Sequence, residues 1–463
     1  MKSFDVAVIG GGLLGCFAAR SLCRYKLKAV LIEADEDVCR GISRANSAVI
    51  YPGYDNKPGS LKAQMTVRAN ADFDRLCDEL EVEFIRRGSL LLSFDEDSDK
   101  ALYKKLHDGT VSKVPGLRLI SGQEAVELEP MLARAPRLAL HAPGTGTVNP
   151  WQLGIAAFEN AIYNGCEAML GVSVLGLEKA EGGYILKTSK DEIFCKAVIN
   201  CAGLSADKLR EMLFEPELRL HFDASDFLVF DKHAPRPDMI LFGESPKGKS
   251  ISLIPTVEGN MLIESRLRQL DLPPYAFKTE ARETLLSEAG KIVKGIDAEN
   301  IIRSFAAVRP NLRQLKKVGG EYVPTDKNLP SFAIDRPEPG FISLIGIKTP
   351  GLSCANELGL HVSDMIADYL DAEENKSFVP RRPAIKQLRN LSRAEQARLC
   401  REDPDYGEIV CLCEGISKAE IKEAIRRGAR SAEGVKRRLG TSMGPCQGSR
   451  CNYAISKILE GEK

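Results

Sequence analysis

Three glycines near the start of the chain have the spacing of a phosphate-binding turn. Gly10, Gly12 and Gly15 follow an apolar, β-branched run at residues 4–9 and open a predicted helix at residues 13–25. In this motif the first glycine permits a tight turn, the second lets a pyrophosphate approach the backbone, and the third lets the helix pack closely on the strand. The alternative is a tight strand–helix turn that binds nothing.

An acidic residue stands where a dinucleotide site needs one. Residues 28–32 form a second apolar run, which ends on Glu33. A carboxylate at this position accepts hydrogen bonds from a ribose, while the N-terminus of the preceding helix directs free N–H groups at the phosphates. Strand, glycines, helix, strand and acid in this order predict a dinucleotide-binding βαβ unit.

Four cysteines near the other end of the chain are clustered. One residue separates Cys411 from Cys413, four separate Cys446 from Cys451, and 32 lie between the two pairs. Two predicted capped helices lie between the pairs, and four thiolates in such a small helical module can hold zinc or an iron–sulfur centre. Zinc modules favour two residues between paired cysteines. A [2Fe–2S] centre, a zinc ion and a degenerate structural module all stay open at this point.

Composition excludes several classes of function. The 463 residues include 64 basic and 64 acidic ones, so no electrostatic footprint for nucleic acid or a membrane surface is present. No apolar run reaches about 18 residues, so we expect no transmembrane segment. The chain opens on a strand and not on a secretion signal, and its 13 cysteines, an odd number, favour reduced thiols in the cytoplasm.

Several separate stretches resemble one family of flavoenzymes. Residues 6–15, 46–63, 198–207 and 346–353 resemble the D-amino acid oxidase and glycine oxidase-like group of FAD enzymes. Within this group the chain is most similar to members of two kinds, the flavin-binding polypeptide of glycerol-3-phosphate dehydrogenase and the L-2-hydroxyglutarate oxidase-like proteins. The resemblance spans about residues 1–370 and implies FAD, with a small-molecule substrate bound over the isoalloxazine ring.

This resemblance implies an α/β fold with interleaved domains. Residues 1–75, 145–215 and 330–370 would form a Rossmann-like FAD-binding domain, and residues 76–144 and 216–329 an α+β substrate domain with an antiparallel sheet. The charged, proline-bearing residues 371–405 predict a linker with one helix, and residues 406–463 a small helical domain that contains the four clustered cysteines.

The resemblance also implies roles for individual residues. The predicted FAD contacts are Gly10, Gly12, Gly15, Glu33, Ser43, Asn46, Ser47, Val174, Gly203, Gly346, Gly351 and Leu352. Arg309 would bind an anionic group of the substrate, since its planar fork suits a carboxylate or phosphate. The alternative for Arg309 is an ion pair inside the substrate domain.

Two positions depart from the family pattern. Relatives commonly have His where this chain has Tyr51, and Tyr is a poor base near neutral pH with its usual pKa of about 10. We therefore expect Tyr51 to orient or desolvate the substrate. Residues 221–226 are acidic where relatives tend to be basic, which disfavours phosphate and suits an ammonium group. Glycerol 3-phosphate, a 2-hydroxy acid and an amino or imino acid stay open as substrates, as does a role for Asp223.

The cysteine spacing and residues 444–448 resemble the BFD-like [2Fe–2S] domain. The resemblance implies that Cys411, Cys413, Cys446 and Cys451 hold the cluster. The nearby basic run Lys436–Arg438 predicts a solvated helix face or a surface that attracts an anionic cluster or an acidic partner.

Three functions follow from these features. The first is an FAD-dependent dehydrogenase that passes electrons through the [2Fe–2S] centre to a partner redox subunit or electron carrier. The second is an oxidase that makes hydrogen peroxide, and the third is a non-catalytic electron-transfer or scaffold subunit, which the missing His at position 51 keeps open.

Overall fold

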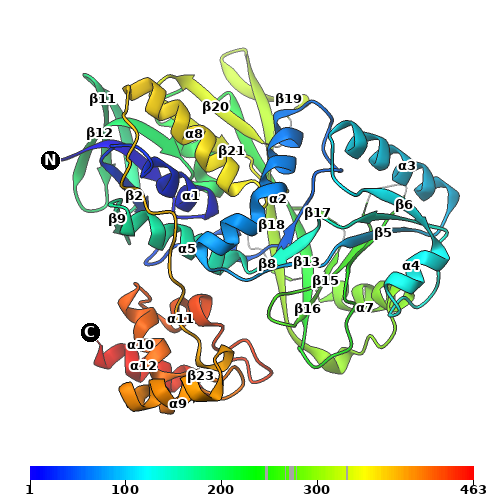
Figure 1. Cartoon of the computed structure of the whole chain (residues 1–463). Helices are drawn as coiled ribbons and strands as arrows, with labels where there is room; N and C mark the ends of the chain where they lie inside the picture. The colour runs from blue at the N-terminus through cyan, green and yellow to red at the C-terminus, as the bar shows by residue number, and fades with distance from the viewer. Residues whose placement is uncertain (246–248, 266, 271–275, 278, 330–331, 463) are drawn as a thin grey trace.

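The computed structural model describes residues 1–245, 249–265, 267–270, 276–277, 279–329 and 332–462 (Figure 1). A first sheet of eight strands contains the glycine motif and runs in the order β10-β11-β12-β1-β2-β9, with β21 beside β12 and β20 beside β21. Its strands are β1 (Lys2–Ile9), β2 (Ala29–Glu33), β9 (Glu167–Leu170), β10 (Val174–Ala180), β11 (Gly183–Thr188), β12 (Glu192–Asn200), β20 (Ala333–Glu338) and β21 (Phe341–Ile345).

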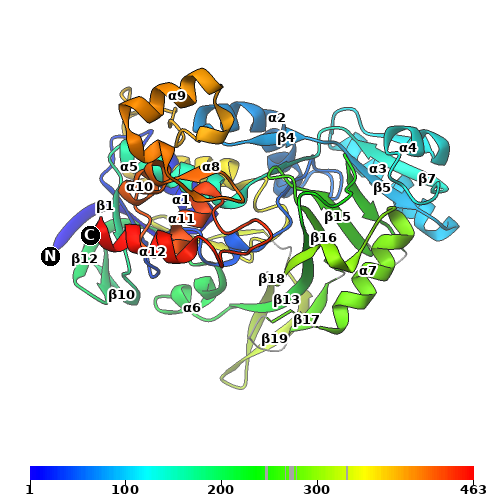
Figure 2. The ribbon, with the colours of Figure 1, turned by 90° about the horizontal axis from the view of Figure 1, so that it is seen from below.

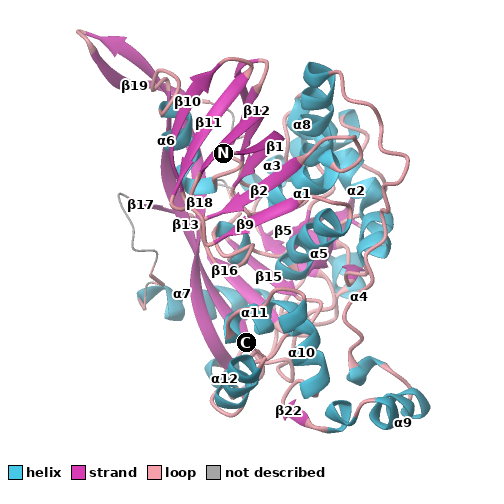
Figure 3. Ribbon diagram, turned by 90° about the vertical axis from the view of Figure 1, so that its left-hand side faces the viewer, coloured by secondary structure: helices cyan, strands magenta, loops and turns pink. Residues whose placement is uncertain are grey.

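The centre of this sheet is parallel and buried. β1 pairs in parallel with β2 and β12, β2 with β9, and β12 with β21. Both faces of such strands are covered, which explains their continuous apolar sequence. Figure 3 shows helices gathered on one side of the sheet. These helices are α1 (Leu13–Leu22), α2 (Leu61–Leu80), α5 (Pro150–Tyr163) and α8 (Ala355–Leu370).

A second sheet of ten strands forms the other large body, on the right of Figure 1. Its order is β19-β18-β13-β16-β15-β14-β5-β7-β6, with β17 beside β13. The two longest strands, β13 (Leu218–Phe230) and β18 (Ile301–Val318), run antiparallel along most of their length. The others are β5 (Ser89–Ser93), β6 (Arg118–Ser121), β7 (Leu138–Ala142), β14 (Ile240–Gly243), β15 (Ile251–Pro255), β16 (Met261–Ser265), β17 (Arg268–Leu270) and β19 (Glu321–Asn328).

The predicted antiparallel sheet has one exception. β14 and β5 pair in parallel, and they come from the two separate segments of chain that build this body. Helices α3 (Glu96–Val111), α4 (Gly122–Leu128) and α7 (Glu280–Ile292) pack on this sheet. A small third sheet of β3 (Val49–Ile50), β8 (Gly146–Val148) and β4 (Phe84–Arg86) joins segments that the sequence assigned to different domains.

The cysteine-bearing module lies at the lower left of Figure 1. Both predicted capping boxes are present: Ser392 with Glu395, and Ser417 with Glu420. Its own apolar core includes Ile421, Val435 and Ile455. The linker helix α9 (Arg393–Glu402) precedes the module, which consists of β22 (Ile409–Cys411), β23 (Ile416–Ser417), α10 (Lys418–Arg426), α11 (Ala432–Leu439) and α12 (Asn452–Gly461). No helix among the described residues is long and apolar enough to span a membrane.

The prediction of an exposed basic face at Lys436, Arg437 and Arg438 is wrong. Their exposed fractions are 5%, 3% and 5%. They lie on α11, which packs against α5 of the first body, and the two arginines form ion pairs with Asp37.

Close backbone packing at Gly15 predicts a large effect of a small substitution. A Cβ atom on Gly15 would lie 1.8 Å from the carbonyl oxygen of Gly10, which belongs to the neighbouring turn. We expect Gly15→Ala to lower stability by about 1–3 kcal/mol or more, because the two backbones must separate. Thermal unfolding and bound flavin per chain measure the effect.

Gly290→Ala is the matched control. Gly290 lies in α7, and no atom outside its own helix turn and chain neighbours lies within 4 Å of the place that an added methyl group would take. Alanine there should leave stability unchanged or raise it by up to about 1 kcal/mol. If Gly15→Ala melted at the same temperature as the unmodified chain, as Gly290→Ala is expected to, the packing argument would be contradicted.

Candidate active site and four-cysteine centre

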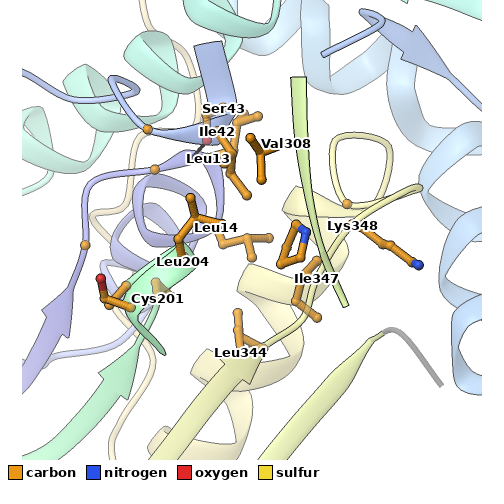
Figure 4. A pocket seen from close by; sticks show the side chains of 18 of the residues that line it. Leu13, Leu14, Ile42, Ser43, Cys201, Leu204, Val308, Leu344, Ile347 and Lys348 are labelled. Carbon is orange, nitrogen blue, oxygen red and sulfur yellow. Dashed lines mark hydrogen bonds between the residues drawn. The ribbon is translucent and has the colours of Figure 1, made fainter. Parts of the chain in front are cut away.

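A cavity of about 530 Å³ lies at the carboxyl ends of β1, β2, β12 and β21. Residues 307–310 of β18 line it from the second sheet, so both large bodies contribute to its walls. Ligands of open parallel sheets bind at this edge. Figure 4 shows apolar side chains, among them Leu13, Leu14 and Val308, facing the cavity.

The glycine turn is shaped by close contacts. Gly10 has φ +104°, and a Cβ atom there would lie 2.4 Å from the carbonyl oxygen of Cys201. A Cβ atom on Gly12 would lie 3.2 Å from Ser43 Oγ, and that hydroxyl accepts a hydrogen bond of 3.0 Å from the Leu13 N–H at the start of α1. The backbone is therefore bare where a pyrophosphate would approach it.

Glu33 lies beside this turn. Its carboxylate accepts hydrogen bonds from the Gly11 N–H at 2.5 Å and from the Asp35 N–H at 2.8 Å. Burial raises the pKa of Glu33, and the two backbone hydrogen bonds only partly offset this. The carboxylate is thus fixed in place at the end of β2, on the cavity wall.

Nearly all of the predicted cofactor residues meet at this one cavity. Gly15 is the exception, because it packs beneath the turn. The residues that line the cavity are Gly10, Gly12, Glu33, Ser43, Asn46, Ser47, Val174, Gly203, Gly346, Gly351 and Leu352, together with Tyr51 and Arg309. The partly apolar lining and the bare glycine turn fit FAD.

Sequence reasoning missed some lining residues. Leu13, Leu14 and Ile42 sit next to predicted positions, so their apolar character beside the motif could have indicated them. Lys348 also lines the cavity and lies inside the stretch at residues 346–353 that carried the resemblance. A positive charge within that stretch could have identified Lys348 as a candidate site residue.

Two cations lie at one end of the cavity. The Arg309 guanidinium pairs with Glu264 and donates a hydrogen bond of 3.3 Å to Thr349 Oγ1. The Lys348 ammonium donates to Asn311 Oδ1, and in Figure 4 its side chain points away from the apolar lining. The ion pair of Arg309 with Glu264 is the alternative that the sequence left open for this arginine, and its role toward a substrate stays a prediction.

The surroundings of Lys348 affect its charge. Burial lowers the pKa of Lys348, Asp223 opposes this effect, and the nearby Arg309 lowers the pKa further. Lys348 in turn contributes to the lowered pKa of Lys62, whose main cause is burial. Lys348 therefore lies near both a cation, Arg309, and a carboxylate, Asp223, and Arg309 is itself paired with Glu264.

Tyr51 is held as an aromatic wall. Its ring stacks on Phe242 with centroids 6.1 Å apart, and the Lys249 ammonium lies 4.8 Å from its centroid. Its backbone N–H donates to Ser353 Oγ at 2.9 Å. Because burial raises the pKa of Tyr51 above its usual value, the phenol gives up its proton less readily than free tyrosine does, and little phenolate is present to act as a base near neutral pH.

The acidic residues 221–226 do not form a loop at the site. They lie within β13, and neither Asp223 nor Asp226 lines the cavity. Asp223 accepts a 2.7 Å hydrogen bond from Asn311, and Asp226 pairs with Arg268 at 2.7 Å. Asp223 still acts on the charge of Lys348, so the effect of this stretch on an anionic substrate stays a prediction.

The four cysteines of the module form two close pairs. The sulfurs of Cys413 and Cys446 are 3.5 Å apart, and Cys411 interacts with Cys451. Across the described part of the chain, no three His, Cys, Asp or Glu side chains are arranged as ligands of a single metal ion. Together the two pairs supply the four thiolates that a binuclear iron centre needs.

Backbone N–H groups point at these sulfurs. Those of Gly448 and Arg450 donate to Cys446 and lower the pKa of its thiol. Those of Ser442 and Glu414 donate to Cys411, although burial still raises the pKa of this thiol to about 11. Such donors stabilise thiolates around an anionic cluster, so the residues fit a [2Fe–2S] centre.

Removing one cysteine tests the pairing. We expect Cys446→Ser to abolish the cluster, measured as iron per chain and the reduced-cluster EPR signal, while bound FAD is unchanged. Cys400→Ser is the control, since Cys400 lies on α9 outside the four. Full iron content in the Cys446 variant would contradict the assignment.

Comparisons with known proteins agree with this geometry. Residues 5–365 match the model of the family "FAD dependent oxidoreductase", and residues 409–461 match that of the "BFD-like [2Fe-2S] binding domain". A glycerol 3-phosphate dehydrogenase of Caloramator mitchellensis is 37% identical, with 99% of this chain and 94% of that protein covered. An L-2-hydroxyglutarate dehydrogenase of Indibacter alkaliphilus is 30% identical over 45% of this chain and 52% of its own length.

Solved structures share the fold of the two large bodies. The FAD-bound L-α-glycerophosphate oxidase of Mycoplasma pneumoniae superposes with a TM-score of 0.73 at 21% identity, covering 82% of this chain and 99% of that one. Nearly the whole of that enzyme thus has a counterpart in this fold. The chain therefore belongs to the FAD-dependent oxidoreductases of the D-amino acid oxidase type and binds FAD, with a [2Fe–2S] cluster in an added BFD-like domain.

Proposed function

We propose that this enzyme is a dehydrogenase that oxidises glycerol 3-phosphate and releases the electrons through its [2Fe–2S] centre to a partner subunit or electron carrier. The observation that carries the proposal is the pair of cations, Arg309 and Lys348, at one end of the flavin cavity. A dianionic phosphate suits two fixed cations. The full-length relative from Caloramator, a glycerol 3-phosphate dehydrogenase by name, supports the same substrate.

In this proposal the chain binds and orients both partners of the reaction. Bound FAD supplies the acceptor for the hydride from the substrate carbon. The bare turn at Gly10 and Gly12 holds its pyrophosphate, and Glu33 its ribose. Arg309 and Lys348 hold the phosphate of the substrate, and the Tyr51 ring excludes water from the reacting carbon. The sheet membership of the strands supports the proposed division into an FAD-binding and a substrate domain.

A 2-hydroxy acid is the second candidate substrate. The L-2-hydroxyglutarate dehydrogenase relative favours it, and Arg309 suits a carboxylate as well as a phosphate. The [2Fe–2S] centre favours a dehydrogenase over an oxidase, because a one-electron centre is needed only if electrons leave singly. We also propose a cytoplasmic location, because an odd number of cysteines, thirteen, favours reduced thiols over a disulfide framework.

Anaerobic flavin bleaching tests the substrate. We expect glycerol 3-phosphate to bleach the flavin absorbance of the holoenzyme, with little change from L-2-hydroxyglutarate, L-proline or glycine. Bleaching by one of the others alone would overturn the phosphate assignment. Stoichiometric peroxide in air would favour the oxidase, and the absence of bleaching by any of them would favour the non-catalytic subunit.

Shortening the arginine tests the anion site. We expect Arg309→Lys to raise KM for glycerol 3-phosphate about 10- to 100-fold, because a charge-assisted hydrogen bond contributes about 1.5–3 kcal/mol. Steady-state kinetics with a one-electron dye measure the effect. Lys316→Gln, an exposed position on the same strand, is the control and should change KM less than about twofold.

The lowered pKa of Lys348 predicts a pH dependence. Below this pKa the ammonium is charged and binds the anion, and as pH rises through it the charge is lost. We expect kcat/KM to fall at alkaline pH, at a lower pH than an ordinary lysine would give. In Lys348→Met the value should start about tenfold lower and lose this alkaline decline. An unchanged profile in the variant would assign the decline to another group.

A further inference from the structure

The basic run on α11 is buried against the flavin-binding body. Asp37 is fully buried and accepts hydrogen bonds from Arg437 at 2.7 Å and from Arg438 at 2.8 and 3.0 Å. The side chains of the two arginines are 3% and 1% exposed. The partners lie 400 and 401 positions apart in the chain, so the contact belongs to the assembled fold and not to local structure.

Asp37 belongs to a segment that the flavin cavity also uses. Residues 33–35 and 41–43 on either side of it line the cavity, although Asp37 itself does not. The Cys39 N–H donates to the carbonyl of Gly11 in the glycine turn at 2.8 Å. One short loop therefore has the flavin site on one face and the cysteine module on the other.

A second acidic residue extends this contact along α5. Glu159 pairs with Arg382 of the linker at 2.7 Å and with Arg427 of the module at 3.3 Å. Figures 1 and 2 show α11 of the module beside α5. The linker and the module are thus both fixed to the same helix.

The single tryptophan of the chain also lies in this contact. Trp151 Nε1 donates to the carbonyl of Arg44 at 2.8 Å, one residue beyond the cavity wall at Ser43. The Lys436 ammonium lies 6.0 Å from the centroid of its ring. Helix α11 therefore contacts the first body through the ion pairs with Asp37 and through the approach of Lys436 to the Trp151 ring.

An ion-pair contact fixes the orientation of the module more closely than an apolar contact would. Burying three ionised groups costs desolvation energy, which good geometry and hydrogen bonds must offset, and the fork of an arginine fits a carboxylate in only a few orientations. A module tethered only by its linker could take many positions. A functional centre works reproducibly when packed, hydrogen-bonded elements fix its position.

We propose that Asp37, Arg437 and Arg438 are positioning residues that lock the cysteine module onto the wall of the flavin cavity, so that the [2Fe–2S] centre keeps one separation from the flavin. This rests on the proposed electron route through the centre. In the step concerned, one electron leaves the reduced flavin and one Fe(III) of the cluster becomes Fe(II), with no bond between heavy atoms made or broken. The final one-electron oxidant is the external carrier or a dye.

The test uses Arg438→Gln, Arg437→Gln and Asp37→Asn in the FAD- and cluster-loaded full chain. Hydrogen exchange of α11 and of residues 34–43 reports docking without any turnover. Flash photoreduction by an external photoreductant, followed by absorbance and EPR, reports electron transfer from flavin to cluster without any substrate. The control is Arg426→Gln, whose side chain is 66% exposed on the same module.

We expect the Arg438 and Asp37 variants to lose protection in α11 and to transfer electrons to the cluster at least about tenfold more slowly, with iron and FAD contents kept. The Arg437 variant, which keeps both hydrogen bonds from Arg438 to Asp37, should show a smaller change of the same kind. Unchanged protection in all three, or an unchanged transfer rate in a variant that has lost protection, would overturn the proposal.

These readouts separate this proposal from the proposed function. A wrong substrate leaves both measurements intact, because neither uses substrate. If the unmodified holoenzyme shows no flavin-to-cluster transfer although α11 is protected, the proposed electron route fails, and the positioning role fails with it.

Discussion

The structure depends on two backbone contacts, at Gly10 and Gly15, that are too close to admit a side chain. At Gly10 the turn after β1 meets the end of β12 at Cys201, and at Gly15 the first turn of α1 lies on Gly10. A single methyl group at either position would overlap a carbonyl oxygen. Because these segments touch, the carboxyl ends of the parallel strands open onto one cavity, and the second sheet can close it through residues 307–310.

The sequence predicted correctly the features that depend on residues close together in the chain. The βαβ unit, the capping boxes at Ser392 and Ser417, and the glycine turn follow from residue type at short spacing. Resemblance to a family supplied the rest of the cavity, including the stretch at residues 346–353. The division into domains stays a prediction, and β4 at residues 84–86, which pairs with a strand from the other segment, shows that its boundary is not sharp.

The sequence did not reveal which residues the charged side chains would pair with, because the charge of a residue does not identify its partner. Asp223 and Asp226 were expected to act on the charge of the substrate. Asp223 accepts a hydrogen bond from Asn311 and Asp226 pairs with Arg268, and their effect on the substrate stays a prediction. Arg437 and Arg438 were expected at the surface, yet they find Asp37 near the opposite end of the chain. A pattern of 3.6 residues identifies an amphipathic helix, but partners separated by hundreds of residues leave no local pattern.

Tyr51 shows how these charges bear on the chemistry. Tyr51 is half-buried and its pKa is raised, so the phenol is a poor base near neutral pH at a position where the resemblance led us to expect a histidine. What the site retains is an aromatic wall and two fixed cations. In the proposed reaction, catalysis would depend on orientation and exclusion of water more than on proton abstraction by residue 51. The same emphasis on fixed geometry holds at the other end of the proposed electron route, where a buried carboxylate and two arginines bind the cysteine module to the loop behind the cavity wall.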